Sequence, residues 1–240
     1  MKISIIVPAF NEEKLLGASL AQIQAAARVL AARGWEHELI VCDNNSTDRT
    51  AEIARAAGAT VVFEPVNQIA RARNTGAAAA TGDWLVFVDA DSHPSPELFA
   101  DMADQMATGT CFAGGAAIKL DEKLLVVGMI ARIWNLSSRI GKWLAGSFIF
   151  IEAAVFRQLG GFSLDLFAGE ELELSKRLKK LARQTGRRMV ILHRHPLTTS
   201  ARKMRLYTAW DHFRLLGRVM QNRRVLTQRE TCHLWYDGRR

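Results

Sequence analysis

The sequence predicts an α/β protein built on a mostly parallel, doubly wound sheet, followed by a less regular second half. Short runs of β-branched and aromatic residues alternate with Ala-rich segments of helical length. The short runs are continuously apolar, as expected for strands buried on both faces. Because a strand, helix, strand order recurs along the first half, right-handed crossovers and a parallel sheet are favoured.

The first half supplies the regular part of the predicted sheet. Strands are expected at residues 3–7, 38–42, 60–63 and 84–88, separated by helices at 12–33, 47–57 and 68–80. Gly34, Gly58 and Gly82 follow these helices, where glycine commonly forms the C-terminal cap. Ser95 and Pro96 are typical of an N-cap and a first helical position, so a further helix is expected to run to residue 106.

The second half is less periodic. Strands are expected at 110–120, 147–151 and 189–192, with an apolar helix or pair of helices at 123–143 and a charged helix at 169–185. A last, amphipathic helix is expected at 205–221. No repeat or flexible linker separates the halves, so we expect residues 1–240 to form a single domain.

Composition excludes several classes of protein. The three cysteines are far apart and include no C-x-x-C pair, which favours reduced thiols over a zinc site or a disulfide framework. The longest uncharged run, residues 105–118, has 14 residues and contains three glycines. A spanning helix needs about 20 apolar residues, so we expect a cytoplasmic protein without a transmembrane segment.

The charge is unevenly distributed. Residues 1–175 hold 14 Lys and Arg against 21 Asp and Glu, whereas residues 176–240 hold 18 against 3. This basic segment fits a solvated face or an anionic partner, such as a phosphorylated substrate or an anionic membrane surface to which the protein attaches peripherally. Nucleic acid is a less favoured partner, because the arginines belong to no recognised reading motif and its binding would be driven mainly by phosphate contacts.

Two aspartates follow a buried strand directly, in the segment FVDADS. Asp89 and Asp91 would repel each other unless a cation lay between them, and their oxygens are the ligands that Mg²⁺ and Mn²⁺ prefer. The alternative is a solvated loop with carboxylates that cap a helix. Polar residues also follow the first two strands, at 8–12 and 43–48, and the carboxyl ends of parallel strands meet at one crevice. P-loop, dinucleotide-binding and G-x-S-x-G motifs are absent.

Four segments, in this order and spacing, resemble the family 2 glycosyltransferases, which have a GT-A fold with a Rossmann-like sheet. They are IIVPAFNEE, LIVCDNNSTDRT, ARARNTGAAAATGDWLVFVDADS and GGFSLDLFAGEELELSKRLKKL, and the resemblance covers about residues 3–199. It implies inverting transfer of a sugar from a nucleotide-sugar donor. It also implies a nucleotide-binding half at 1–109 and a donor and acceptor half at 110–200, before the basic amphipathic segment at 201–240.

The resemblance assigns roles to individual residues of the first half. It implies a divalent metal, Mn²⁺ or Mg²⁺, held by Asp91 with Asp89, and a nucleotide base contacted by Asp43. Arg73, helped by Arg71, matches the basic residue near the nucleotide. The remaining residues implied to line the nucleotide pocket are Pro8, Ala9, Phe10, Glu12, Asp89 and Ala90.

The catalytic base is implied to lie in GEELEL. Glu171 stands where the family has its catalytic aspartate, but glutamate reaches one methylene further, so Glu170 remains an alternative. Either glutamate could instead stabilise a helix N-terminus. The Q-x-x-R-W motif of processive synthases is absent, which favours transfer of single sugars.

Late residues complete the predicted site. Some GT-A enzymes use a late histidine as a metal ligand, which makes His195 the candidate here, with His193 behind it, although an ordinary strand-end histidine is the alternative. Gly160, Gly161 and Phe162 resemble the family's G-G-F, which shapes the donor and acceptor pocket, or they form a helix C-cap.

Two other functions remain open from the sequence. A sugar nucleotidyltransferase also pairs carboxylates on Mg²⁺, but PAFNEE is acidic where that class has a basic, glycine-rich signature. A basic module that binds membranes or nucleic acid without catalysis is the non-enzymatic alternative. The sequence does not identify the sugar, the nucleotide base or the oligomeric state. The acceptor could be a polyprenyl phosphate, a glycolipid or a small metabolite.

Overall fold

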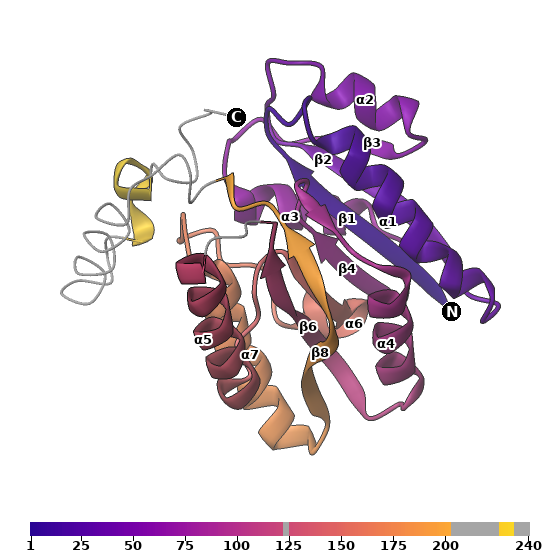
Figure 1. Ribbon diagram of the computed structural model, residues 1–240, viewed down its shortest axis with the longest axis vertical. Helices are drawn as coiled ribbons and strands as arrows, with labels where there is room; N and C mark the ends of the chain where they lie inside the picture. The colour runs from indigo at the N-terminus through magenta and orange to yellow at the C-terminus, as the bar shows by residue number, and fades with distance from the viewer. Residues whose placement is uncertain (122–124, 203–225, 233–240) are drawn as a thin grey trace.

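The computed structural model describes residues 1–121, 125–202 and 226–232. It is an α/β fold with one eight-stranded sheet in the order β3-β2-β1-β4-β7-β6-β8-β5, covered by helices (Figure 1). The pairs formed among strands β1 to β4 are all parallel, as predicted. Strand β7 runs antiparallel to both β4 and β6, which was not predicted.

The parallel half follows the predicted order of elements. The strands are β1 (Lys2–Ala9), β2 (Glu36–Asp43), β3 (Thr60–Phe63) and β4 (Trp84–Val88), and the helices are α1 (Leu16–Ala31), α2 (Thr50–Ala56) and α3 (Ile69–Ala79). Helix α1 begins four residues later than expected because residues 11–15 form a turn. Asn11 has a positive φ of 51° there, and the carbonyl of Glu12 accepts from the backbone N–H groups of Leu15 and Leu16.

Of the three glycines that were expected to cap helices, two follow a helix end in the left-handed conformation and the third does not. Gly34 and Gly58 have φ values of 69° and 77°, in the left-handed region that ends helices. Gly82 is not a cap, because α3 ends at Ala79 with an extended Ala80 at its C-cap. A Cβ on Gly82 would lie 2.6 Å from Ser4 Oγ, so the close approach of this loop to β1 requires glycine here.

The second half of the chain adds strands to the same sheet, in both parallel and antiparallel pairs. Its elements are β5 (Ser92–His93), α4 (Pro96–Ala107), β6 (Cys111–Leu120), α5 (Leu125–Gly141), β7 (Phe148–Glu152), α6 (Ala153–Gln158), α7 (Glu170–Thr185), β8 (Arg188–Thr199) and a 3-10 turn, η2 (Arg229–Cys232). Strand β8 is longer than predicted because it pairs with β6 and then with β5 as far as Thr199. The predicted helix at 205–221 lies outside the described residues.

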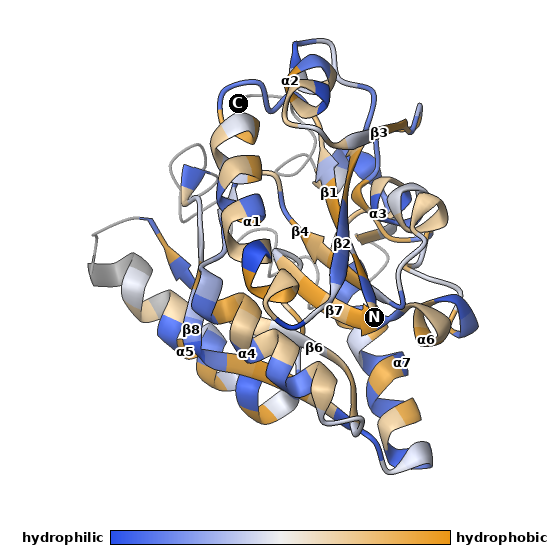
Figure 2. Cartoon of the chain, turned by 90° about the vertical axis from the view of Figure 1, so that its right-hand side faces the viewer, coloured by the Kyte–Doolittle hydropathy of each residue, from blue (hydrophilic) through white to orange (hydrophobic). Residues whose placement is uncertain are grey.

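Apolar side chains pack on both faces of the sheet. In Figure 2 the ribbons of the central strands β4 and β7 are coloured as hydrophobic. Along β4, Trp84 and Val86 pack on the side of α1 and α4, and Leu85 and Phe87 on the side of α3, α6 and α7. The three cysteines are buried, and none of them forms a disulfide. Among the described residues no helix is long and apolar enough to cross a bilayer.

Candidate active site

Two adjoining cavities lie at the carboxyl edge of the parallel strands, and both are lined by Ile69, Asp89 and Asp91. The first is also lined by residues that follow β1 and β2: Pro8, Ala9, Phe10, Glu12 and Asn44. The second has a volume of about 280 Å³, close to the roughly 300 Å³ of the smaller small-molecule sites. Its lining includes Glu170 and Glu171. The FVDADS and GEELEL segments therefore face one continuous space.

The antiparallel strand β7 brings the second half to Asp89. Because β7 pairs with β4 along its length, the residues before β7 lie beside the residues after β4. The backbone N–H of Asp89 donates to the carbonyl of Ser147 at 3.3 Å, and Gly146 and Ser147 line the second cavity. The unpredicted direction of β7 is thus what connects the two halves of the site.

Arg73 of α3 joins the two acidic segments. Its Nη2 donates to Asp89 Oδ1 at 3.0 Å and to the carbonyl of Gly146 at 3.1 Å, and its Nη1 donates to Glu170 Oε1 at 2.6 Å. Only 3% of the Arg73 side chain and 5% of the Glu170 side chain are exposed. A Cβ on Gly146 would lie 2.8 Å from Nη2, so glycine is needed for this approach.

The G-G-F segment holds the helix that carries Arg73. Asn74 Oδ1 accepts from the backbone N–H of Phe162, and Asn74 Nδ2 donates to the carbonyl of Phe162, both at 2.9 Å. Gly161 has a φ of 73°, and a Cβ there would lie 2.7 Å from Asn74 Oδ1. The Arg73 guanidinium lies 5.3 Å from the centre of the Phe162 ring. In this structure the segment therefore positions Arg73, and none of its three residues is among those that line the two cavities.

The buried charges shift one another's ionisation. Burial lowers the pKa of Arg73, but the carboxylates of Asp89, Glu170 and Glu171 outweigh that effect and raise its pKa above the usual range. Glu171 is half-buried and lines the second cavity. Removal of its carboxyl from water, and secondly the charge of Glu170, raise the pKa of Glu171 from 4.5 to about 8, although Arg73 opposes the change.

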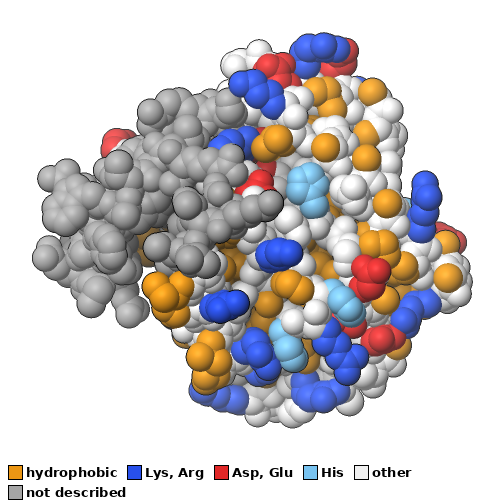
Figure 3. All heavy atoms as spheres, viewed as in Figure 1, with side chains coloured by type: hydrophobic (Ala, Val, Ile, Leu, Met, Phe, Trp, Pro, Cys, Tyr) orange, Lys and Arg blue, Asp and Glu red, His pale blue; other side chains and the backbone are white. Residues whose placement is uncertain are grey.

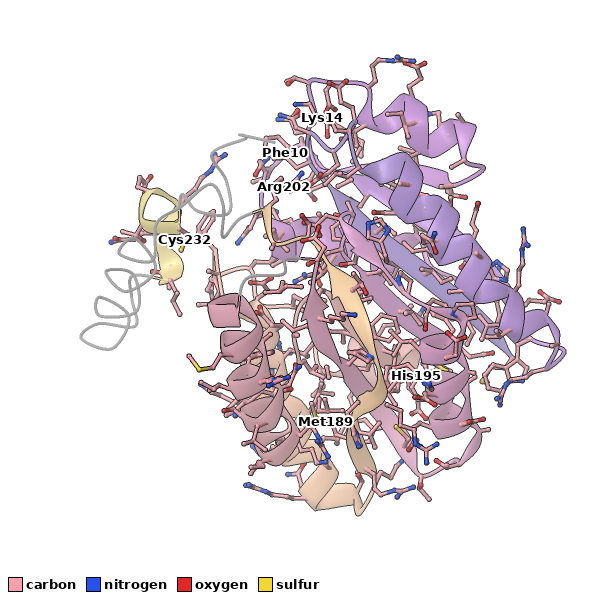
Figure 4. The ribbon with its side chains drawn as sticks, in the orientation of Figure 1. Phe10, Lys14, Met189, His195, Arg202 and Cys232 are labelled. Atoms are coloured by element: carbon pink, nitrogen blue, oxygen red, sulfur yellow. The ribbon has the colours of Figure 1, made fainter. Side chains whose placement is uncertain are left out.

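A second arginine, Arg202, approaches from the other side of Asp91. Its guanidinium donates to both carboxylate oxygens of Glu12, at 2.9 and 3.0 Å, and its Nη2 lies 3.6 Å from Asp91 Oδ2. Figure 4 shows it at the end of β8, next to the loop that carries Phe10. The sequence analysis missed this residue, because it is one of many cations in the basic segment.

Strand β8 determines where Arg202 lies. Ser92 Oγ of β5 donates to Thr199 Oγ1 of β8 at 3.0 Å, and the backbone N–H of Ser200 donates to the carbonyl of Asp91 at 3.2 Å. Through these bonds the end of β8, which lies between β6 and the edge strand β5, is held beside the loop after β4. The sequence signal that could have revealed this is the β-branched pair Thr198 and Thr199, which extends the strand beyond residue 192.

Some predicted residues line neither cavity. Asp43 is buried at the end of β2, where its Oδ1 accepts from the backbone N–H of Ser46 at 3.0 Å, and its neighbour Asn44 lines the first cavity instead. Arg71 donates through Nε to Gln68 Oε1 at 3.1 Å. Of the predicted nucleotide-pocket residues, those that do line the first cavity are Pro8, Ala9, Phe10, Glu12, Asp89 and Ala90.

The structure does not bring His195 to the aspartates. Its Nδ1 lies 3.1 Å from Asp101 Oδ2 of α4, and its side chain is 45% exposed (Figure 4). The residues of β8 and its end that line the second cavity are Thr199 and Ser200. His193 lines a separate cavity between α4 and β8. Because the strand does not end at residue 192, His195 lies away from the aspartates in this structure, and its role as a metal ligand stays a prediction.

The two aspartates fit a divalent cation that shares its ligands with phosphate. Within the described ranges no three His, Cys, Asp or Glu side chains group as a metal site. Mg²⁺, however, is often held by one or two carboxylates together with substrate phosphates and water. Asp91 lines both cavities with a side chain that is 14% exposed, and Asp89 lies beside it. These residues could hold such an ion at the junction of the cavities.

Comparison with known proteins identifies the family. The model of glycosyl transferase family 2 matches residues 4–145, more than half of the chain. The chain therefore belongs to glycosyl transferase family 2. The fold class and the family that were predicted from the sequence are confirmed.

Two relatives illustrate the range of the family. An uncharacterized glycosyltransferase of Mycobacterium tuberculosis, Rv0539, is 38% identical over 104 residues, 42% of this chain and 43% of that protein. The undecaprenyl-phosphate 4-deoxy-4-formamido-L-arabinose transferase of Pseudomonas paraeruginosa is 33% identical over 119 residues, 45% of this chain and 33% of that protein. Both matches span less than half of the relative's length.

One solved structure shows how far the fold extends along the chain. The mannosyltransferase PcManGT from Pyrobaculum calidifontis, solved in complex with GDP-Man and Mn²⁺, superposes with a TM-score of 0.66 at 21% identity. The match covers 98% of this chain and 70% of that one. At this identity the likeness shows the GT-A fold alone.

Proposed function

We propose that this chain transfers a single sugar from a nucleoside-diphosphate sugar to an acceptor hydroxyl or phosphate, with inversion at the anomeric carbon. The observation that carries the proposal is the continuous space between Asp91 and Glu171, with Arg73 bonded to acids from both segments. A donor whose diphosphate lay at Asp91 and whose sugar extended toward Glu171 would span this space. We further propose residues 1–109 as the nucleotide-binding half and 110–200 as the donor and acceptor half.

The first cavity is proposed to take the nucleoside. Phe10 and Ile69 offer apolar contact to a base, and Asn44 lies at the same wall. Asp43 and Arg71 remain predicted contacts that would require the loops after β2 and β3 to adjust. Asp91, with Asp89, would hold a Mn²⁺ or Mg²⁺ ion, which would neutralise charge on the leaving diphosphate.

Glu171 is proposed as the general base. Glu170 is bonded to Arg73 and almost wholly buried, whereas Glu171 lines the cavity and has a raised pKa. A carboxylate whose pKa is near neutrality is well matched to remove a proton from an acceptor hydroxyl as that oxygen attacks the anomeric carbon. A positioned base contributes about 10²- to 10⁴-fold to the rate.

The acceptor is proposed to be lipid-linked. The name of the Pseudomonas relative gives it an undecaprenyl-phosphate acceptor, and the second cavity of this chain includes Trp134 and Ile118, which offer apolar contact beside Glu171. The basic segment would favour an anionic membrane surface. No feature of the site favours a nucleotidyltransferase or a binding module without catalysis.

Release of nucleoside diphosphate tests the proposal. The protein would be screened by thermal shift against UDP-, GDP- and dTDP-sugars with Mn²⁺, and the stabilising donor would be incubated with polyprenyl phosphate. We expect nucleoside diphosphate and a glycosylated lipid, both lost in Asp91→Ala and both retained in Asp104→Ala, which removes an exposed acid paired with Arg33. Pyrophosphate release, or no stabilisation by any donor, would contradict the proposal.

A further inference from the structure

Helix α5 carries an apolar stripe on its outer face. Met129, Ile133, Leu136 and Ile140 are 56%, 61%, 58% and 76% exposed. Their spacing of four, three and four residues places them along one side of the helix. Figure 3 shows hydrophobic side chains gathered at the surface where Figure 1 draws α5. We call these four residues the α5 stripe.

The stripe does not face the protein's own core. The opposite side of α5 contacts the sheet, because Ala131 and Ser138 are buried and Asn135 bonds to β6. Asn135 accepts from the backbone N–H of Ile118 at 2.9 Å and donates to its carbonyl at 2.8 Å, which fixes the rotation of the helix. A helix side that is apolar is expected to be buried, even when the opposite side already contacts the core. The outer side therefore indicates a partner.

The charges around the stripe indicate an anionic partner. The 17 residues of α5 include Arg132 and Arg139 and no acidic residue. Helix α7 lies against the end of α5, since Lys179 Nζ donates to the carbonyl of Gly141 at 2.9 Å and lies 3.0 Å from the centre of the Trp143 ring. Three further basic side chains of α7 are exposed: Lys176, Lys180 and Arg183. A second copy of the chain would bring like charges together, which disfavours self-association through this face.

We propose that the α5 stripe docks the protein onto an anionic lipid bilayer. The four aliphatic side chains would enter the boundary between headgroups and acyl chains, while the flanking Arg and Lys side chains would contact lipid phosphates. Docking in this way would set the second cavity close to the bilayer, because Trp134 of α5 and Ile118, which Asn135 anchors, both line that cavity. A lipid-borne acceptor could then reach Glu171 without leaving the membrane.

Vesicle sedimentation of the full chain tests the proposal without any donor. Wild type would be compared with Ile133→Ser/Ile140→Ser and with the control Phe63→Ser/Val66→Ser. The control residues are 57% and 48% exposed at the β3 edge of the sheet. With phosphatidylserine vesicles we expect the partition coefficient of the α5 variant to be at least about tenfold lower than that of wild type. The control variant should match wild type. All the substituted side chains are exposed, so circular dichroism should show unchanged folding.

Charge variants separate the two parts of the interaction. Arg132→Gln/Arg139→Gln should weaken binding to phosphatidylserine vesicles by about fivefold for each charge removed, and should change binding to phosphatidylcholine vesicles little. Equal sedimentation of wild type and the Ile133→Ser/Ile140→Ser variant would overturn the proposal. So would a dimer that this variant abolishes, because the stripe would then join two copies. Since no sugar transfer is measured, either result is independent of the proposed function.

Discussion

Two arginines reach the carboxylates after β4, and the protein encloses them differently. Arg73 comes from α3 within the core, is 3% exposed, and is bonded to acids from both halves of the chain. Arg202 comes from the end of β8, is 16% exposed, and is bonded to Glu12 with Asp91 further away. The first is an internal counter-charge that fixes geometry. The second lies at the rim, where a bound cation could compete with it for the carboxylates of Glu12 and Asp91.

Removal of Arg73 should have the larger effect on stability. Arg73→Met would leave Glu170 buried without its counter-charge, so we expect a loss of about 3–5 kcal/mol in the free energy of unfolding. Urea unfolding would measure it. Arg71→Met, on the same helix, is the matched control and should change stability by much less, because Arg71 bonds only to Gln68 in the described structure. Equal losses in the two variants would show that the bonds of Arg73 do not contribute unusually to the free energy of unfolding.

Removal of Arg202 should have a smaller effect that metal reverses. Arg202→Gln breaks two charged hydrogen bonds to Glu12, and we expect a loss of about 1–3 kcal/mol without metal. The variant also leaves more negative charge around Asp91, so Mn²⁺ should raise its melting temperature more than it raises that of wild type. A smaller rise in the variant would indicate that Arg202 supports cation binding instead of competing with it.

A third expected effect is a pH dependence of stability, caused by Glu171 beside Arg73. The folded-state pKa of Glu171 lies above its ordinary value of 4.5, so between about pH 5 and 8 the folded state binds more protons than the unfolded state. Stability should therefore fall as pH rises through this window, by at most about 1.4 kcal/mol per pH unit for one proton. The Glu171→Gln variant should lack this contribution. Urea unfolding of both proteins at a series of pH values would measure it. The same slope of the unfolding free energy against pH in both proteins would show that Glu171 titrates normally.

The sequence motifs allowed much of the fold to be predicted, and also the part of the site that contains Arg73. Strands β1 to β4 are continuous apolar runs with the helices of the parallel half between them, and local patterns of that kind are readable from sequence. The FVDADS and GEELEL segments were predicted to share a cleft, and they do. The antiparallel direction of β7 could not be predicted, because pairing direction depends on contacts between distant segments.

The presence of Arg202 in the site was not predicted, for a related reason. His195 was chosen as a late ligand on the assumption that the last strand ends near residue 192, but β8 continues to Thr199 through pairing with β6 and β5. The chain therefore reaches the site seven residues later, with Arg202 in place of a histidine. Which of many cations in a basic segment meets Glu12 is decided by that extension, and composition carries no information about it.

Glu171→Gln gives the most direct test of the central account, in which donor binding and proton removal use separate carboxylates across one cavity. Calorimetry with the donor and Mn²⁺ and a turnover assay would be run on the same preparation. We predict donor affinity close to that of wild type and a turnover about 10²- to 10⁴-fold lower. Turnover close to wild type, or loss of donor binding in step with turnover, would contradict the account.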